Sequence, residues 1–119
     1  MIWLDVLRAF FFAVLYGFME NRVFYEEDMD YAILKHFKLY HLSMFGLFAI
    51  VSFSLCFVTW IFGLLMMPLV QDASWFIFEG RLPRRDDWTN WGGLPLILGL
   101  PVWYWISSAI LETLAVIFA

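Results

Sequence analysis

Two histidines are the side chains of this 119-residue chain best suited to binding a metal or a cofactor. His36 and His41 are five residues apart, which places them about 140° apart around a helix, so they cannot chelate one ion together without a bend. His41 alone could ligate a haem or a chlorophyll-type pigment at the start of a long apolar stretch. A hydrogen-bonded or interfacial histidine is the simpler interpretation, and the sequence requires no cofactor.

Carboxylates near His36 suggest a second kind of metal site. Glu26 and Asp30 precede this histidine, and hard cations take carboxylate ligands while imidazole suits transition metals. The spacings of these three residues match no defined metal-binding template. A solvated acidic face is therefore the preferred interpretation, and a metal site made of His36, Glu26 and Asp30 is the alternative.

Three charged residues lie inside long apolar stretches. Asp5 and Arg8 are three positions apart, so they share one face of a helix and can pair while leaning toward the lipid headgroups. Glu112 lies in the last apolar stretch, where a carboxylate is costly enough to suggest a function. It can contact a partner, extend to the nearby membrane surface, or bind a proton or an ion.

The composition indicates where such residues must be placed. Hydrophobic residues make up 64% of the chain and charged residues 15%, whereas soluble proteins are roughly half apolar and about a quarter charged. A soluble fold of this length has too little interior to bury so much apolar surface, but a lipid bilayer solvates it. A net charge of −4 without a basic stripe excludes a nucleic-acid-binding protein.

Three apolar stretches are each long enough to cross a bilayer core of roughly 30 Å. The sequence therefore predicts one all-α integral membrane domain, residues 1–119, that crosses the membrane three times, with short interfacial helical segments between the crossings. A kink at Pro101, or a helix that starts there, is expected in the third stretch. The predicted spans and the polar or interfacial segments between them are, in chain order, 2–19, 20–41, 42–69, 70–95 and 96–119.

Two features of this topology stay open. A helix that runs from Asp28 to Leu69 would be about 60 Å long, so it would have to project from the membrane or bend near His41. Three spans place the chain ends on opposite sides, but the orientation is undetermined, because each polar segment carries three basic residues and the positive-inside rule finds no asymmetry. These residues are Arg22, Lys35 and Lys38 in the first segment, and Arg81, Arg84 and Arg85 in the second.

Small residues recur every three or four positions in the first two spans. Because small side chains let membrane helices approach closely, we expect the two stripes to pack against each other. The first stripe consists of Ala9, Ala13 and Gly17, and the second of Ala49, Ser52, Cys56, Thr59 and Gly63.

No phosphate-binding loop, dinucleotide fingerprint, metalloprotease motif or nucleophile elbow is present, so no catalytic activity of its own is expected of this chain. The preferred hypothesis is a non-catalytic accessory subunit of a larger membrane complex, of a respiratory or otherwise redox-linked kind. Its expected partners are the lipid bilayer and other membrane subunits or further copies of itself. The alternatives are a haem- or pigment-binding membrane protein that uses His41, and a small homo-oligomeric transporter or channel that uses Glu112.

Overall fold

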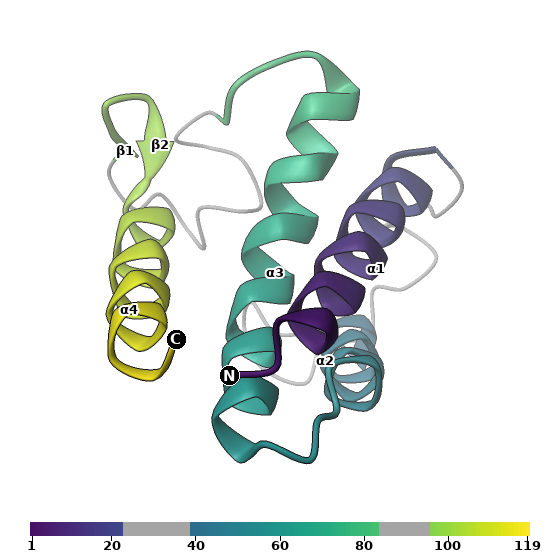
Figure 1. The fold of residues 1–119 in the computed structure, drawn as a ribbon. Coiled ribbons are helices and arrows are strands. Elements are labelled where there is room, and N and C mark those ends of the chain that lie inside the picture. The colour runs from purple at the N-terminus through teal and green to yellow at the C-terminus, as the bar shows by residue number, and fades with distance from the viewer. Residues whose placement is uncertain (23–38, 84–95) are drawn as a thin grey trace.

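The computed structural model describes residues 1–22, 39–83 and 96–119, which form four α-helices and one two-stranded hairpin. The central helix, α3, has α1 on one side and α4 on the other (Figure 1). The described part of the chain is therefore all-α apart from the hairpin. In chain order the elements are α1 Trp3–Arg22, α2 Leu39–Val51, α3 Phe57–Glu79, β1 Leu96–Ile97, β2 Leu100–Pro101 and α4 Val102–Phe118.

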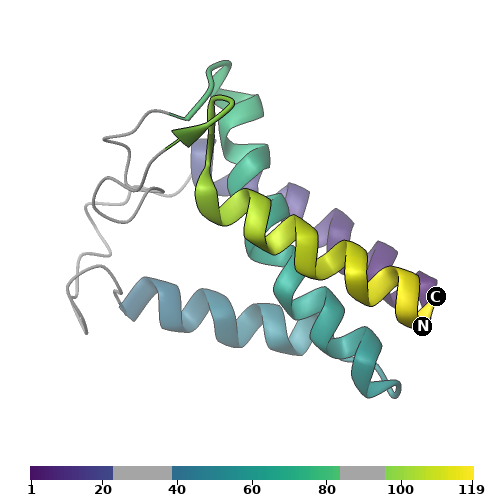
Figure 2. The ribbon, with the colours of Figure 1, turned by 90° about the vertical axis from the view of Figure 1, so that its left-hand side faces the viewer.

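The most extensive contact in the molecule joins α1 and α3, which run in the same direction. Near the start of both helices the Ile2 N–H donates to the Thr59 hydroxyl at 2.8 Å. Near their ends the Asn21 amide donates to the Glu79 carboxylate at 2.7 Å. Along the chain, α2 comes after α1 and before α3, and it runs in the direction opposite to both (Figure 2).

The hydrophobic core lies where the four helices meet. Phe48 of α2 is fully buried, and its ring meets the ring of Tyr16 of α1 edge-on at a centroid distance of 5.2 Å, an arrangement that aromatic pairs prefer. The buried apolar residues of this core are Val6, Ala9, Ala13, Met44, Phe48, Phe62, Met66, Met67 and Leu111.

The predicted second span, 42–69, is wrong as a single helix. The chain forms two helices in this range, because α2 ends at Val51 and α3 begins at Phe57. In the turn between them the Cys56 N–H donates to the Ser54 hydroxyl at 3.2 Å. Serine hydroxyls offer the backbone an alternative to helical hydrogen bonds, so they favour a break where no proline or glycine occurs.

The carbonyl groups freed at this break receive donors from other helices. The Arg8 guanidinium of α1 donates to the carbonyl oxygens of Val51, at 3.0 Å, and of Phe53. The Trp60 indole of α3 donates to the Ala49 carbonyl at 2.9 Å. Since the last carbonyls of a helix lack partners within it, these tertiary contacts stabilise the end of α2.

Replacing Arg8 with methionine is therefore expected to destabilise the fold. A typical hydrogen bond contributes about 0.5–1.5 kcal/mol net, and we expect the low end of that range because both contacts are exposed and solvent screens the loss. Thermal unfolding in one detergent measures the effect. The Asp5→Asn control removes only the 2.9 Å ion pair with Arg8, so a loss as large as that of Arg8→Met would show that the backbone contacts are unimportant.

The central helix extends beyond the predicted end of the second span. It passes Pro68 without a break and ends at Glu79, so residues 70–79, which belong to the predicted polar or interfacial segment 70–95, continue the helix. Gly80 follows with a left-handed φ of 81°, and its N–H donates to the Ile77 carbonyl at 3.2 Å. Glycine adopts this conformation at little cost, so the helix ends in a Schellman-type cap.

The helix in the predicted third span, 96–119, is shorter than that span, because α4 covers only Val102–Phe118. The first residues of the predicted span form the hairpin, in which Leu96 pairs with Pro101 and Ile97 with Leu100. The two residues of its turn, 98 and 99, both have positive φ, which is typical of a tight type I′ turn. The helix α4 starts immediately after Pro101, one of the two outcomes expected for that proline.

Within the described ranges, α3 is the one helix long and apolar enough to cross a membrane by length and composition, and α4 is shorter. The two chain ends lie together (Figure 2), because the Met1 amino group donates to the Phe118 carbonyl at 3.0 Å. The prediction that three spans place them on opposite sides is therefore wrong. The extra helix created by the break after Val51 returns the chain to the end at which it started.

Candidate functional site

The second half of α3 carries polar side chains that are almost completely buried. Gln71 and Asp72 are each 3% exposed, and Ser74 is 6% exposed. Successive side chains of a helix point about 100° apart, so Gln71 and Asp72 can contact different helices. Gln71 contacts α1, and Asp72 contacts α4.

On the α4 side, the Tyr104 hydroxyl donates a hydrogen bond to the Asp72 carboxylate, and both side chains are buried. Tyr104 lies in the first turn of α4, so the start of that helix is held against α3. A buried polar group without a hydrogen-bond partner is costly. This pair is therefore a buried polar contact that stabilises the packing of α4 against α3.

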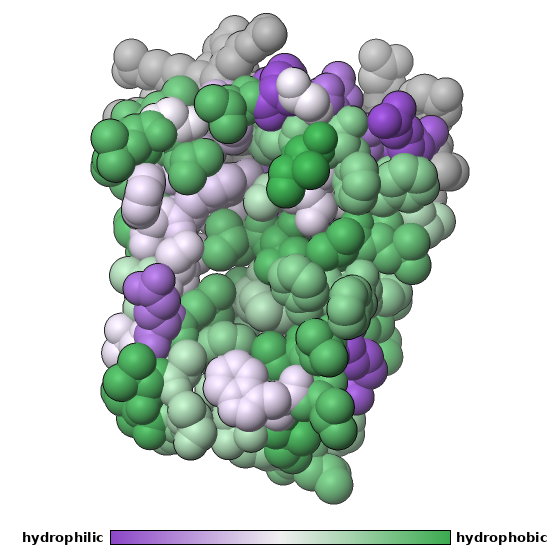
Figure 3. All heavy atoms as spheres, turned by 45° about the horizontal axis from the view of Figure 1, so that its top comes forward, coloured by the Kyte–Doolittle hydropathy of each residue, from purple (hydrophilic) through white to green (hydrophobic). Residues whose placement is uncertain are grey.

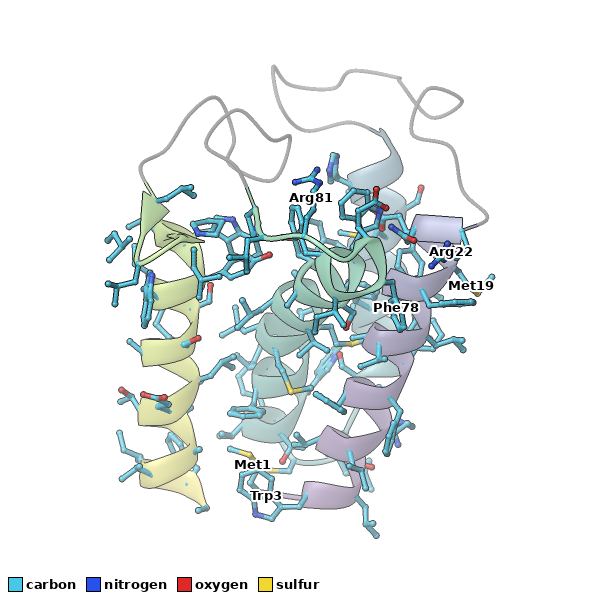
Figure 4. The ribbon with its side chains drawn as sticks, turned by 90° about the horizontal axis from the view of Figure 1, so that it is seen from above. Met1, Trp3, Met19, Arg22, Phe78 and Arg81 are labelled. Atoms are coloured by element: carbon cyan, nitrogen blue, oxygen red, sulfur yellow. The ribbon has the colours of Figure 1, made fainter. Side chains whose placement is uncertain are left out.

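On the α1 side, three polar contacts join the ends of the two parallel helices. The Gln71 amide donates to the Glu20 carboxylate at 2.7 Å, about two turns of α3 before the contact between Asn21 and Glu79. The Arg22 guanidinium donates to the Phe78 carbonyl at 3.3 Å, and Figure 4 shows these two residues at the same end of the molecule. The Arg22 contact provides a donor for a carbonyl in the last turn of α3.

Asp72 and Tyr104 were not predicted as a site. Gln71 and Asp72 follow the predicted second span, 42–69, and a charge after an apolar run usually marks the end of a span. The apolar stretch that follows, Trp75 to Phe78, was the available signal. Two apolar runs on either side of a short polar stretch also fit one long helix whose polar residues face neighbouring helices.

The first predicted stripe of small residues lies on the buried face of α1. Ala9 and Ala13 are fully buried, and Gly17 is buried against α3. A Cβ atom at Gly17 would lie 2.6 Å from the Gln71 carbonyl oxygen and 2.9 Å from the Ser74 Cβ. The backbones of α1 and α3 thus approach so closely here that only a hydrogen atom fits.

The second predicted stripe does not lie on a single helix, because the turn at 52–56 interrupts it. Ser52, Thr59 and Gly63 are buried, and a Cβ atom at Gly63 would lie 3.0 Å from the Ser52 Cβ and 3.6 Å from the Ala9 Cβ. The remaining members, Ala49 and Cys56, are half-buried.

Cys56 lies in the turn immediately before α3, outside the helix that is long enough to span a membrane. A hydrogen bond from the Thr59 side chain, followed by one from the Thr59 backbone, lowers the pKa of the Cys56 thiol. Both stabilise the thiolate, as donors at the start of a helix commonly do. The thiol belongs to the connection between α2 and α3.

The other residues singled out from the sequence are dispersed. His41 is half-buried on α2, Glu112 is exposed on α4, and Asp5 is paired with Arg8 on α1. The proposed metal ligands Glu26, Asp30 and His36 lie outside the described residues. Among the residues that are described, no group of three or more His, Cys, Asp or Glu side chains could hold a metal ion.

The described polar groups thus join helices to one another. Arg8 of α1 donates to the end of α2, Gln71 of α3 donates to α1, and Asp72 of α3 accepts from α4. The chain matches no protein-family model, and comparisons with curated proteins and with solved structures return no match either.

Proposed function

We propose that this chain is a non-catalytic subunit of a larger membrane complex, embedded in the bilayer as a multi-pass helical protein. Its internal polar contacts stabilise the helix arrangement, and its outer faces contact lipid and neighbouring subunits. The observation that carries the proposal is the exposed carboxylate of Glu112 on an otherwise apolar helix face.

The outer surface supports a position in the bilayer. Large apolar side chains are exposed on every helix, including Leu4 on α1, Ile50 on α2, Ile77 on α3 and Val116 on α4. Apolar residues cover most of the face shown in Figure 3, and hydrophilic ones gather mainly near its upper edge. Burying one such side chain away from water gains about 1.5–3 kcal/mol, so a bilayer stabilises this surface and water does not.

The dimensions of α3 agree with a crossing. Its 23 residues extend about 34 Å, which matches a hydrocarbon core of roughly 30 Å. Contacts at both ends of α1 with α3 support the same depth for α1 in the proposed bilayer position. For α4, the Asp72–Tyr104 pair fixes its start, and the contact between Met1 and Phe118 fixes its end.

Membership of a complex is supported by Glu112. This residue lies six positions before the end of α4, and the exposed residues three and four positions away on the same face are Ala109 and Val116. No hydrogen bond or ion pair involves Glu112 within the described ranges. A carboxylate that faces lipid is costly, whereas a neighbouring membrane helix with a basic or hydroxyl side chain would stabilise it.

Purification from native membranes in a mild detergent tests the proposal. The chain is expected to resist extraction by alkaline carbonate and to elute with other proteins at a size well above its own 14.1 kDa plus a detergent micelle. A chain that eluted alone, monodisperse and stable would contradict membership of a complex. Release by carbonate would contradict a position in the bilayer.

The Glu112→Leu variant tests the face that carries the proposal. We expect it to lower the fraction of chain retained in the complex several-fold, because the interaction with a partner donor is lost. Val116→Leu alters the same exposed face without changing charge, so it serves as the matched control and should retain the complex. Equal retention of the two variants would remove Glu112 from the interface.

A further inference from the structure

The two ends of the helix bundle differ in their basic residues. We call the end where α1 and α3 finish the loop end, marked by Arg22 and Glu79, and the opposite end the terminal end, marked by Met1 and Phe118. Figure 4 shows Arg22 and Arg81 at one end of the molecule and Met1 and Trp3 at the other. Arg22 and Arg81 follow the apolar parts of α1 and α3, and both lie at the loop end.

Among the described residues, the terminal end has one arginine. Arg8 forms a 2.9 Å ion pair with Asp5, and it also donates to the carbonyl oxygen of Val51. The arginines of the described residues are Arg8, Arg22 and Arg81. The asymmetry among described residues is thus two arginines against one.

Chain connectivity increases this asymmetry. The sequence from Arg22 to Leu39 contains Lys35 and Lys38, and α2 starts toward the loop end because its final residue, Val51, contacts Arg8 at the terminal end (Figure 2). The sequence from Pro83 to Leu96 contains two more arginines, and it connects the end of α3 to the start of α4. Six of the seven basic residues therefore belong to segments that begin and end at the loop end.

Arg81 also has the surroundings of a residue at a membrane surface. It follows the glycine cap of α3, and its guanidinium lies 5.6 Å from the centre of the Trp75 ring and 5.1 Å from that of Phe76. Tryptophan and arginine are typical of the boundary between lipid and water, where the apolar ring and the charged group are both solvated. The end of α3 thus fits the headgroup level.

We propose that the chain lies in the membrane with its loop end in contact with the cytoplasmic leaflet and its terminal end on the opposite side. Lysine and arginine in short segments beside a span are retained on the cytoplasmic side, while aspartate and glutamate have little influence on orientation. The sequence alone showed no preference, because a three-span topology placed three basic residues on each side. The fold brings the described ends of both segments to the loop end and so creates the preference.

This inference rests on the proposed position in the bilayer, and cysteine labelling tests it. In a Cys56→Ser background, one variant carries Leu82→Cys, at an exposed position of the loop end, and another carries Ala119→Cys, at an exposed position of the terminal end. Intact cells are treated with a membrane-impermeant maleimide before and after permeabilisation. We expect Ala119→Cys to be labelled several-fold more than Leu82→Cys in intact cells, and both to be labelled equally once the membrane is opened.

The reverse ratio in intact cells would overturn the orientation, and equal labelling would overturn it as well. Carbonate extraction of the same samples separates the two proposals, because a chain released by carbonate is not embedded and the proposed function itself then fails. A variant with Arg81→Gln, Arg84→Gln and Arg85→Gln should reduce the labelling ratio, whereas Arg8→Gln should not. An unchanged ratio in the triple variant would show that these arginines do not set the orientation.

Discussion

Replacement of Gly17 with alanine is expected to be the most destabilising single-methyl change among the described glycines. The new Cβ atom would lie 2.6 Å from the Gln71 carbonyl oxygen and 2.9 Å from the Ser74 Cβ. Overpacking of this kind costs about 1–3 kcal/mol. We expect the upper end, because a helix backbone cannot rotate away from the new atom as the tip of a side chain can.

Two other glycines provide a graded comparison in the same thermal unfolding experiment. Gly63→Ala should have a smaller effect, since its new methyl would lie 3.0 Å from the Ser52 Cβ. Gly46→Ala is the matched control, because nothing lies within 4 Å of the new atom and alanine favours a helix by up to about 1 kcal/mol. If Gly17→Ala were as stable as Gly46→Ala, the close approach of α1 and α3 would be wrong.

Loss of the Tyr104 hydroxyl is expected to have the second-largest effect. Tyr104→Phe preserves the ring but removes a donor to Asp72, a residue that is 3% exposed. Loss of a hydrogen bond to a buried acceptor costs about 1–3 kcal/mol. We therefore expect the free energy of unfolding to fall by an amount in this range, with α4 separating from α3 first.

A double-mutant cycle isolates this pair. Asp72→Asn and Tyr104→Phe are measured singly and together, and the combined loss should be smaller than the sum of the single losses by about 0.5–3 kcal/mol, because each change removes the same interaction. Additive losses would show that the two side chains do not stabilise the fold through one another.

The amino-acid pattern locates the apolar stretches that contain α1 and α4. The first apolar run, 2–19, overlaps α1 at Trp3–Arg22, and α4 begins directly after Pro101, one of the two outcomes expected for that proline. Both predictions depend on local chemistry, because a long apolar run favours a helix and proline is tolerated at a helix start. The local sequence is sufficient to predict a helix when neither end of that helix depends on a residue far away in the chain.

The break after Val51 could not be predicted in the same way. Ser52 and Ser54 are weak signals, and the carbonyl groups at the break find their donor on Arg8, more than forty positions earlier in the chain. The burial of Asp72 depends likewise on Tyr104, thirty-two positions later. A hydropathy scale counts Arg8 and Asp72 as unfavourable in a span. In the fold, each of them forms a hydrogen bond with a polar group of another element.

The parallel arrangement of α1 and α3 also determines the order in which contacts can form during synthesis. The buried face of α1 meets its main neighbour only after α2 and the whole of α3, as far as Glu79, have been made. Ribosomes add about 5–20 residues per second, so the chain from Arg22 to Glu79 takes several seconds. Throughout that time Ala9, Ala13 and Gly17 lack the helix that covers them in the fold, so this face of α1 stays without its main neighbour while the chain is still growing.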